Sequence, residues 1–194
     1  DAEYIGAARV FHTSGITQAI SETSRRTALQ AVRMAKERGV MVSFDPNLRP
    51  ILWPSLDEAR RALEEVLPYV DIFLPSSQDA SRMLGLEDPE ESIRSLWQRG
   101  VRIVAIKMGD QGCLVGANGR IERVPAFKVE QVVDTSGAGD AFNGAFLHGI
   151  ISGLSPVDAA RLGVIMAGLK VRGRGAIASM PRREEVYSHF SRRP

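Results

Sequence analysis

A glycine-containing loop followed directly by a helical pattern is the part of the sequence best suited to chemistry. The loop is Asp134-Thr135-Ser136-Gly137-Ala138-Gly139-Asp140, and residues 141–150 continue with apolar residues at helical spacing. Small residues let backbone N–H groups approach a ligand closely, and a helix N-terminus attracts anions. A carboxylate such as Asp140 would repel an anion, so it is an unexpected residue in a loop that only binds anions. A catalytic role explains it: Asp140 would take a proton from an attacking hydroxyl while the amides hold a phosphoryl group. The alternative is an ordinary turn in which Asp140 is a charge at the start of a helix.

A second polar segment, Asp45-Pro46-Asn47-Leu48-Arg49, comes directly after the apolar run 40–44. Arginine carries a planar fork of donors that fits a carboxylate or a set of hydroxyls, and Asn and Asp side chains can hold hydroxyl groups in fixed geometry. These residues therefore indicate a site for a small polar substrate. The alternative is a proline-stiffened loop whose polar groups cap the helix that follows.

The elements that must position these loops alternate along the chain. Strands are expected at 7–13, 40–44, 72–74 and 101–107, and helices at 21–38, 56–67, 77–84 and 89–99. Apolar runs at 112–115 and 121–124 flank Asn118-Gly119, which is a hairpin signal, and helices are expected at 138–152, 156–171 and 181–190. The alternation predicts an α/β protein with a mostly parallel sheet covered by helices on both faces. Ligands are then expected beyond the carboxyl ends of the strands, where Asp45 and Gly109 fall.

Composition limits the classes of function. The 194 residues are 44% hydrophobic and 25% charged, which predicts one globular domain over residues 1–194. A net charge of +2 is too small to indicate nucleic-acid binding, and no apolar run reaches the length of a membrane span. The single cysteine, Cys113, excludes an internal disulfide and suits a buried thiol in a reducing cytoplasm. Four arginines near the C-terminus are assigned to a solvated surface: Arg182, Arg183, Arg192 and Arg193.

The loop at 134–140 and the helix with Phe142 resemble the second signature, D-T-x-G-A-G-D, of the ribokinase or PfkB family of carbohydrate kinases. The resemblance implies a ribokinase-like three-layer α/β/α fold and an ATP- and Mg²⁺-dependent phosphotransferase acting on the primary hydroxyl of a sugar. It makes Asp140 the catalytic base, in contact with the substrate. The anion hole would be formed by Gly137, Ala138 and Gly139. Asp134 matches the residue that helps to bind a monovalent cation such as K⁺.

The resemblance also covers a nucleotide side. It assigns nucleotide contacts to Lys107, Gly109, Gly112, Gly137, Gly139 and Gly175. Lys107 fits a contact with the phosphates, and fits equally a strand end whose side chain reaches toward solvent. The loop 172–176 matches the segment that closes over the adenine and completes the cation site, or is a flexible exit from a helix. Where the family has an N-x-x-E magnesium motif, this chain offers Ser76 and Asp79, so Asp79 is the candidate for holding Mg²⁺ through water.

The stretch 43–53, S-F-D-P-N-L-R-P-I-L-W, is similar to a segment of the fructokinases and 2-keto-3-deoxygluconate kinases within this family. Residues 12–17 resemble the latter kinases more closely. The resemblance implies that Asp45, Asn47 and Arg49 bind the substrate, with Arg49 on the carboxylate or keto end. The expected substrate is 2-keto-3-deoxygluconate, and fructose is the alternative.

The Gly-Gly first signature of the family and its small lid β-sheet do not occur before Ala7. The expectation is therefore the C-terminal part of a single kinase domain, with the N-terminal third and the lid absent. The alternative from another class is a nucleotide-binding fragment or interaction protein without catalysis. The full-length form is expected to be a cytoplasmic homo-oligomer whose partners are ATP and a small sugar or sugar acid, with no nucleic acid or membrane.

Overall fold

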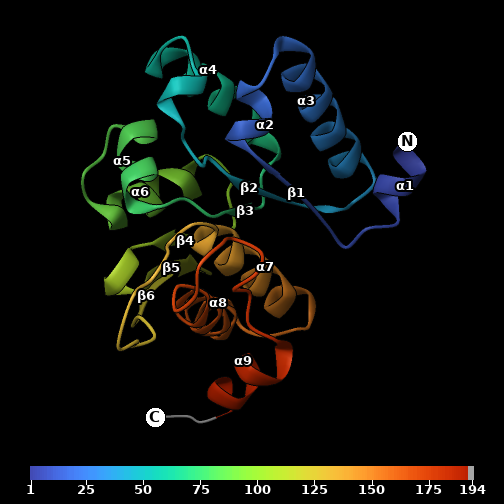
Figure 1. Ribbon diagram of the computed structural model, residues 1–194. Helices are drawn as coiled ribbons and strands as arrows, with labels where there is room; N and C mark the ends of the chain where they lie inside the picture. Colours follow the sequence, from blue (N-terminus) through green and yellow to red (C-terminus); the bar gives the residue numbers. More distant parts are fainter. Residues whose placement is uncertain (192–194) are drawn as a thin grey trace. The chain divides into compact units, whose positions relative to one another are not determined.

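A computed structural model of the chain describes residues 1–191 (Figure 1). Arg192 and Arg193, assigned above to a solvated surface, lie outside the described residues. The strands of the described part form one sheet, in which β1 to β6 follow one another in chain order. The internal contacts divide the chain into two compact units. The first holds residues 1–106 and 116–119, and the second holds 107–115 and the described residues from 120 onward. The single-domain prediction stays a prediction.

Parallel strands form the centre of the first unit. They are β1 (Val10–Ser14), β2 (Met41–Asp45), β3 (Ile72–Phe73) and β4 (Ile103–Lys107), of which Lys107 is grouped with the second unit. In register, Ser14 lies beside Asp45, and Phe73 lies beside both Phe44 and Val104. Consecutive residues such as Val104 and Ala105 are buried although they point to opposite faces, as is typical of a parallel sheet covered on both sides.

Most α-helices of this unit begin at side chains that cap them, whereas Ser14, at the start of the helix Gly15–Ala19, makes no side-chain capping hydrogen bond within the described residues. The helices are α1 (Ala2–Gly6), α2 (Gly15–Ala19), α3 (Glu22–Glu37), α4 (Leu56–Val66), α5 (Ser77–Leu84) and α6 (Pro89–Gln98), with 3-10 turns η1 (Pro50–Leu52) and η2 (Leu67–Tyr69). Ser21, Ser55 and Ser76 each accept the backbone N–H three residues on. Such caps satisfy donors that a helix leaves unpaired at its start. In α3 the buried positions are Ala28, Val32 and Ala35, one apolar stripe at helical spacing.

A tight hairpin precedes the helices of the second unit. It joins β5 (Cys113–Ala117) to β6 (Arg120–Val124), and both turn residues have positive φ, 52° at Asn118 and 74° at Gly119. This is the conformation of a type I′ turn, which matches the twist of a hairpin. Burial raises the pKa of the Cys113 thiol to about 12, so that thiol stays protonated near neutral pH.

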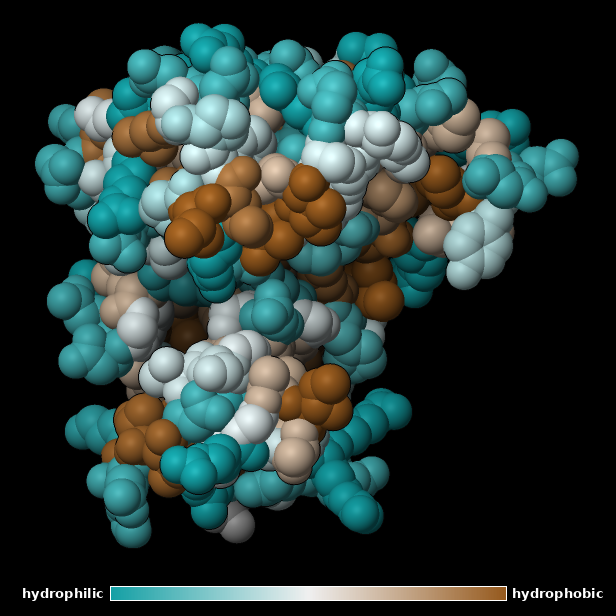
Figure 2. Space-filling model, turned by 45° about the horizontal axis from the view of Figure 1, so that its top comes forward, coloured by the Kyte–Doolittle hydropathy of each residue, from teal (hydrophilic) through white to brown (hydrophobic). Residues whose placement is uncertain are grey.

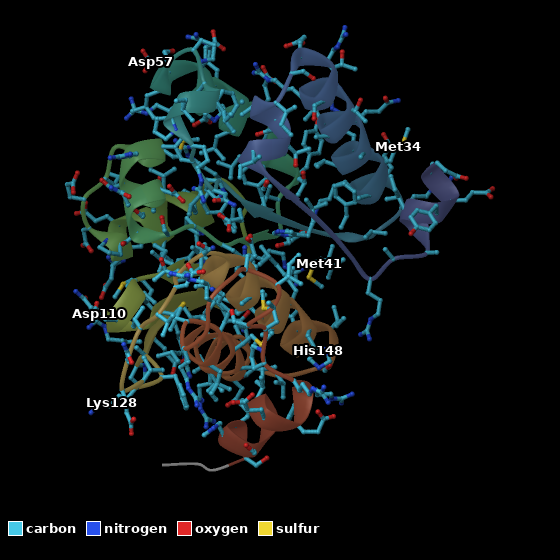
Figure 3. All side chains as sticks on the ribbon, viewed as in Figure 1. Met34, Met41, Asp57, Asp110, Lys128 and His148 are labelled. Carbon is cyan, nitrogen blue, oxygen red and sulfur yellow. The ribbon has the colours of Figure 1, made fainter. Side chains whose placement is uncertain are left out.

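Three helices build the core of the second unit. They are α7 (Ala138–Ile151), α8 (Pro156–Lys170) and α9 (Arg183–Phe190), and α8 packs against both others. A methyl group at Gly149 would lie 2.9 Å from Ala159, and one at Gly163 would lie 2.7 Å from the Phe142 ring. These glycines therefore let α7 and α8 approach closely. Near the far end of α7, His148 Nε2 lies 2.9 Å from the hydroxyl oxygen of Tyr187 in α9 (Figure 3).

The α/β prediction with a mostly parallel sheet is confirmed, and the boundaries of most elements are close to the predicted ones. Two short helices were not predicted: α1, capped by Asp1, and α2. The first strand accordingly begins at Val10 rather than at residue 7. α2 starts at Gly15, where a methyl group would lie 2.1 Å from the Pro46 carbonyl oxygen. This close approach joins residues far apart in the sequence, so the spacing of apolar residues within the segment could not predict where α2 begins.

Apolar side chains also reach the surface, as the space-filling view shows (Figure 2). The large exposed hydrophobic residues include Tyr4, Ile51, Val132, Val133 and Ile177. Among the described residues, no helix has the length and apolar character needed to cross a membrane.

Candidate active site

The anion loop predicted from the sequence lies at the start of α7. Gly137 has φ 77°, a left-handed conformation that glycine adopts without strain, and a methyl group there would lie 3.1 Å from Ala176 Cβ. No side chain in the described part of the chain caps α7. Ala138 N donates to Thr135 O and Ala141 N to Gly137 O, whereas within residues 1–191 no acceptor occurs for the N–H groups of Gly139 and Asp140. Unpaired donors at a helix N-terminus form an anion-binding site.

Lys107 brings a positive charge to this loop. It is the last residue of β4, and its Nζ donates a hydrogen bond of 3.0 Å to Oδ1 of Asn143, which is buried in α7. A methyl group at Gly139 would lie 3.6 Å from Lys107 Nζ. The ammonium therefore lies beside the same amides, and the two together suit the phosphates of a nucleotide.

Asp140 lies in the first turn of α7, and it is exposed. Its carboxylate makes no hydrogen bond or ion pair with another described residue. An exposed carboxylate beside unpaired amides can accept a proton from a hydroxyl group that approaches a phosphoryl group held there.

Asp134 ties the anion loop to the segment that follows α8. Its Oδ1 accepts from Ser136 N at 2.9 Å and its Oδ2 accepts from Gly175 N at 2.8 Å. The Ser136 hydrogen bonds, the Gly175 amide and the charge of Lys170 hold the pKa of Asp134 well below its usual range. Asp134 is therefore ionised at neutral pH, and it fixes Gly175 beside the loop.

The donor set at Asp134 fits a monovalent cation poorly. Besides the two bonds to its carboxylate, its backbone carbonyl accepts a hydrogen bond of 2.8 Å from Lys170 Nζ. All three oxygens thus already face N–H donors, and one of these is an ammonium group. A cation bound to the same carbonyl would be repelled by Lys170.

The remaining nucleotide-side glycines lie in the turn after β4. Gly109 has φ 59° and opens the 3-10 turn η3 (Gly109–Gln111), and Gly112 has φ 89°. Met108 N donates to Gly112 O at 2.8 Å, which closes the turn. A methyl group at Gly112 would lie 2.1 Å from Val124 O. Gly112 is therefore required by the close approach of the backbone in this unit, whatever it contacts in a ligand.

The predicted substrate residues lie together in the first unit. Asp45 ends β2 and is buried, and its Oδ1 accepts from Asn47 N at 3.0 Å. This turn holds Asn47 at φ 39°. Arg49 is exposed, and its Nη1 donates to the Leu48 carbonyl at 3.2 Å. The segment thus presents an accessible guanidinium next to a rigid polar turn.

Ser76 and Asp79 have a local structural role. Ser76 is the N-cap of α5 and its Oγ accepts from Asp79 N at 3.0 Å, so Asp79 lies in the first turn of the helix. A carboxylate there interacts well with the helix dipole without a metal. The described residues contain no group of three or more His, Cys, Asp or Glu side chains placed to hold a metal ion. The assignment of Asp79 to Mg²⁺ through water stays a prediction.

The base and the nucleotide residues predicted from the sequence all belong to the second unit, from Lys107 to Gly175. Asp79 and three of the predicted substrate residues belong to the first: Asp45, Asn47 and Arg49. Two residues were missed: Asn143, which positions Lys107, and Lys170, which binds Asp134 O. A signal for Lys170 does exist, because it falls four residues after Met166 and seven after Gly163, in the apolar register of α8.

Comparison with known proteins gives consistent matches. A model of the pfkB family of carbohydrate kinases matches residues 1–183. The chain is 36% identical to fructokinase-1 of Zea mays, over 96% of the chain and 59% of that protein. It is 39% identical to 2-dehydro-3-deoxygluconokinase of Thermoproteus tenax, over 96% of the chain and 56% of that protein. The fold matches a putative ribokinase II of E. coli in complex with ATP and Mg²⁺, with a TM-score of 0.89, 28% identity, and coverage of 100% of this chain and 62% of that one.

The chain therefore spans less than two thirds of the length of these curated relatives. The family match and the relatives agree over nearly all of it. With the D-T-x-G-A-G-D loop placed at the N-terminus of α7, these matches show that the chain belongs to the pfkB family of carbohydrate kinases.

Proposed function

We propose that this chain is the phosphoryl-transfer part of an ATP-dependent kinase that phosphorylates the primary hydroxyl of a small keto-sugar or sugar acid. The observation that carries the proposal is the set of groups at the start of α7. The Gly139 and Asp140 amides have no acceptor within the described residues, Lys107 lies beside them, and the Asp140 carboxylate is exposed next to them. Anion binding and proton acceptance are thus available at one place.

The residues divide the chemistry as follows. The backbone at 137–139 and the Lys107 ammonium hold the phosphates and stabilise the charge on the phosphoryl group as it moves. Asp140 accepts the proton of the sugar hydroxyl while the hydroxyl oxygen forms its bond to the γ-phosphorus. The bond between the γ-phosphorus and the β,γ-bridging oxygen breaks, and its electron pair leaves with ADP. The products are the sugar phosphate, ADP and a proton on Asp140. ATP supplies the phosphoryl group, and Mg²⁺ neutralises part of the phosphate charge.

The loop geometry fits the phosphates because its donors are in place before a ligand arrives. Gly137 turns the chain into α7, and the bond from Gly175 N to Asp134 Oδ2 ties the loop to the exit from α8. Donors fixed in this way need little reorganisation as charge develops, which is the main source of catalysis in phosphoryl transfer. Gly109 and Gly175 are proposed to line the nucleotide on the same grounds.

We infer that the substrate is an acidic keto-sugar, with 2-keto-3-deoxygluconate favoured and fructose as the alternative. Arg49 supports the acidic sugar, since its exposed guanidinium can form a bidentate pair with a carboxylate. Asp45 and Asn47 are proposed to hold hydroxyl groups. The relatives include both kinds of kinase, at 36% and 39% identity, which supports the class and leaves the choice of sugar to experiment.

Two further features of the whole protein belong to the proposal. The single cysteine, Cys113, leaves no internal disulfide in this chain, and we propose a reducing, cytoplasmic location. The full-length form is proposed to be a homo-oligomer, as the resemblance to the family implies.

The test is a coupled assay of ADP release by the purified full-length form with ATP and Mg²⁺, beside the 194-residue chain alone, for which little or no sugar-dependent turnover is expected. The sugars are 2-keto-3-deoxygluconate, fructose and ribose, with a reaction lacking sugar as the control. We expect sugar-dependent ADP release that is fastest with 2-keto-3-deoxygluconate, and ³¹P NMR should place the phosphate on the primary hydroxyl. Release that is independent of sugar would contradict the proposal. Tight ATP binding without turnover on any sugar would favour the alternative, a nucleotide-binding fragment without catalysis.

A further inference from the structure

A buried lysine lies at the point where a monovalent cation is expected from the family resemblance. Lys170 is the last residue of α8, and its side chain is fully buried, with 0% exposure. Its Nζ donates to the backbone carbonyl of Asp134 at 2.8 Å. Burying an ammonium group is costly unless it is hydrogen-bonded and faces negative charge. A structural core position would ordinarily take an apolar residue, so this charge needs a specific explanation.

The negative charge that balances Lys170 belongs to Asp134. The backbone amides of Ser136 and Gly175 donate hydrogen bonds to this carboxylate, but they carry no net charge and do not neutralise it. The charge of Lys170 is among the causes that keep the pKa of Asp134 low. The pair therefore places one fixed positive charge against one carboxylate directly behind the anion loop.

The backbone around Asp134 is held to the end of α8 at several points. Val133 N and Asp134 N both donate to Val171 O, at 2.8 and 3.2 Å. Ser179 Oγ donates to Gly175 O at 2.6 Å, which fixes the second loop. A bound potassium ion would join two loops by attracting their oxygens with a single charge. The Lys170 ammonium already carries that charge, and an ammonium group is close to K⁺ in size and charge.

We propose that Lys170 acts as a built-in monovalent cation: its ammonium occupies the position of K⁺ beside the anion loop, and nucleotide binding by this chain needs no added monovalent cation. The inference rests on the proposed function for its effect on ATP. Lys170 is a positioning residue in this scheme, because it acts on the ligand through the loop that begins at Asp134.

The test compares the wild type with three variants in KCl and in tetramethylammonium chloride at equal ionic strength and constant Mg²⁺. Lys170→Ala removes the charge and opens space for an ion. Lys170→Met removes the charge and keeps most of the volume. Lys128→Ala is the matched control, since Lys128 is an exposed lysine of the same unit (Figure 3). ATP affinity is measured by calorimetry, and melting temperature is measured without nucleotide.

The wild type and Lys128→Ala are expected to bind ATP equally well in both salts. Lys170→Ala should bind about tenfold more weakly in tetramethylammonium and regain most of that loss in K⁺ or NH₄⁺, a coupling of ordinary size between two sites. Lys170→Met should lose affinity in both salts. Without nucleotide, K⁺ should raise the melting temperature of Lys170→Ala more than that of the wild type, because the ion binds only the folded variant.

An ATP affinity of the wild type that is much higher in KCl than in tetramethylammonium chloride would overturn the inference. Failure of K⁺ to restore Lys170→Ala in either readout would also overturn it, since a merely structural lysine predicts a loss that no ion repairs. Should Lys170→Ala fail to fold, the salt dependence of the wild type decides the question alone. A wild type that binds no ATP in any salt would refute the proposed function, while the melting temperatures would still decide the inference about Lys170.

Discussion

Lys107 Nζ and Asn143 Oδ1 lie 3.0 Å apart in a hydrogen bond that joins the end of β4 to the second turn of α7. Asn143 is buried, and its partner is the cation that lies beside Gly139. The amide therefore helps to hold the ammonium group beside the anion loop. A cation on a flexible side chain would otherwise lose conformational freedom each time it bound a phosphate.

This relationship predicts different losses for the two residues. Lys107→Met should weaken ATP binding by about ten- to a hundredfold, because a charge-assisted hydrogen bond to phosphate is lost. Asn143→Ala should weaken it less, since the charge remains and only its position is released. Calorimetry on both variants and on the double variant gives the coupling between them. Unchanged ATP affinity in Lys107→Met would mean that Lys107 does not contact the phosphates and has only a structural role at the end of β4.

Asp140→Asn tests the proposed base. In the full-length form, we expect the substitution to lower kcat by about two to four orders of magnitude with little change in ATP affinity. The asparagine side chain keeps the shape of the carboxylate and loses its basicity. Asp57→Asn is the control, because Asp57 is likewise an exposed acid in the first turn of a helix, α4 (Figure 3). Near-normal turnover of Asp140→Asn would refute the role as base.

Two glycines of the second unit should respond in opposite ways to a methyl group. Gly139→Ala adds a group 3.6 Å from Lys107 Nζ, which is an ordinary contact, so we expect a nearly unchanged melting temperature and weaker ATP binding. Gly112→Ala adds a group 2.1 Å from Val124 O at φ 89°, so the folded state should lose about 1–3 kcal/mol or more. Thermal denaturation and ATP titration of both variants check this contrast. Equal melting temperatures for the two would contradict it.

Arg49→Ala should separate acidic from neutral sugars. We expect KM for 2-keto-3-deoxygluconate to rise by about tenfold or more, because a bond between two charged groups is lost, while KM for fructose rises less. The comparison requires both sugars to be assayed with the same enzyme preparation. Equal rises for the two would indicate that Arg49 reads hydroxyl groups common to both, or only supports the loop.

Elements marked by local chemistry could be predicted from the sequence. Ser21 caps α3 and Gly39, at φ 71°, follows its end, so both boundaries were within one residue. By contrast, α2 has few apolar positions and opens with Gly15, a residue disfavoured in helices. Its start depends on the contact between Gly15 and the Pro46 carbonyl, which lies far away in the sequence. Periodicity carries no information about such a contact.

The candidate site likewise has a part that local sequence predicts and a part that depends on contacts between distant residues. The anion loop is continuous in sequence, from Asp134 to Asp140, and its residue types alone predict the tight turn and the open helix end that the structure contains. The bond from Lys170 to Asp134 joins residues 36 positions apart. A lysine in the last turn of a helix is ordinarily explained by the helix dipole, and this competes with the apolar register that points to its burial, so the sequence does not identify Asp134 as its partner.

The attachment of the anion loop to the last residues of α8 makes helix length a functional property. Each residue turns an α-helix by about 100°, so one residue inserted within α8 would rotate Lys170 out of the core and move Val171 O away from the loop. The connection between α7 and α8, with Gly153 at φ 84°, lies outside that constraint. Changes in chain length should therefore be tolerated in this connection and excluded from α8, even where they leave every residue type of the loop unaltered.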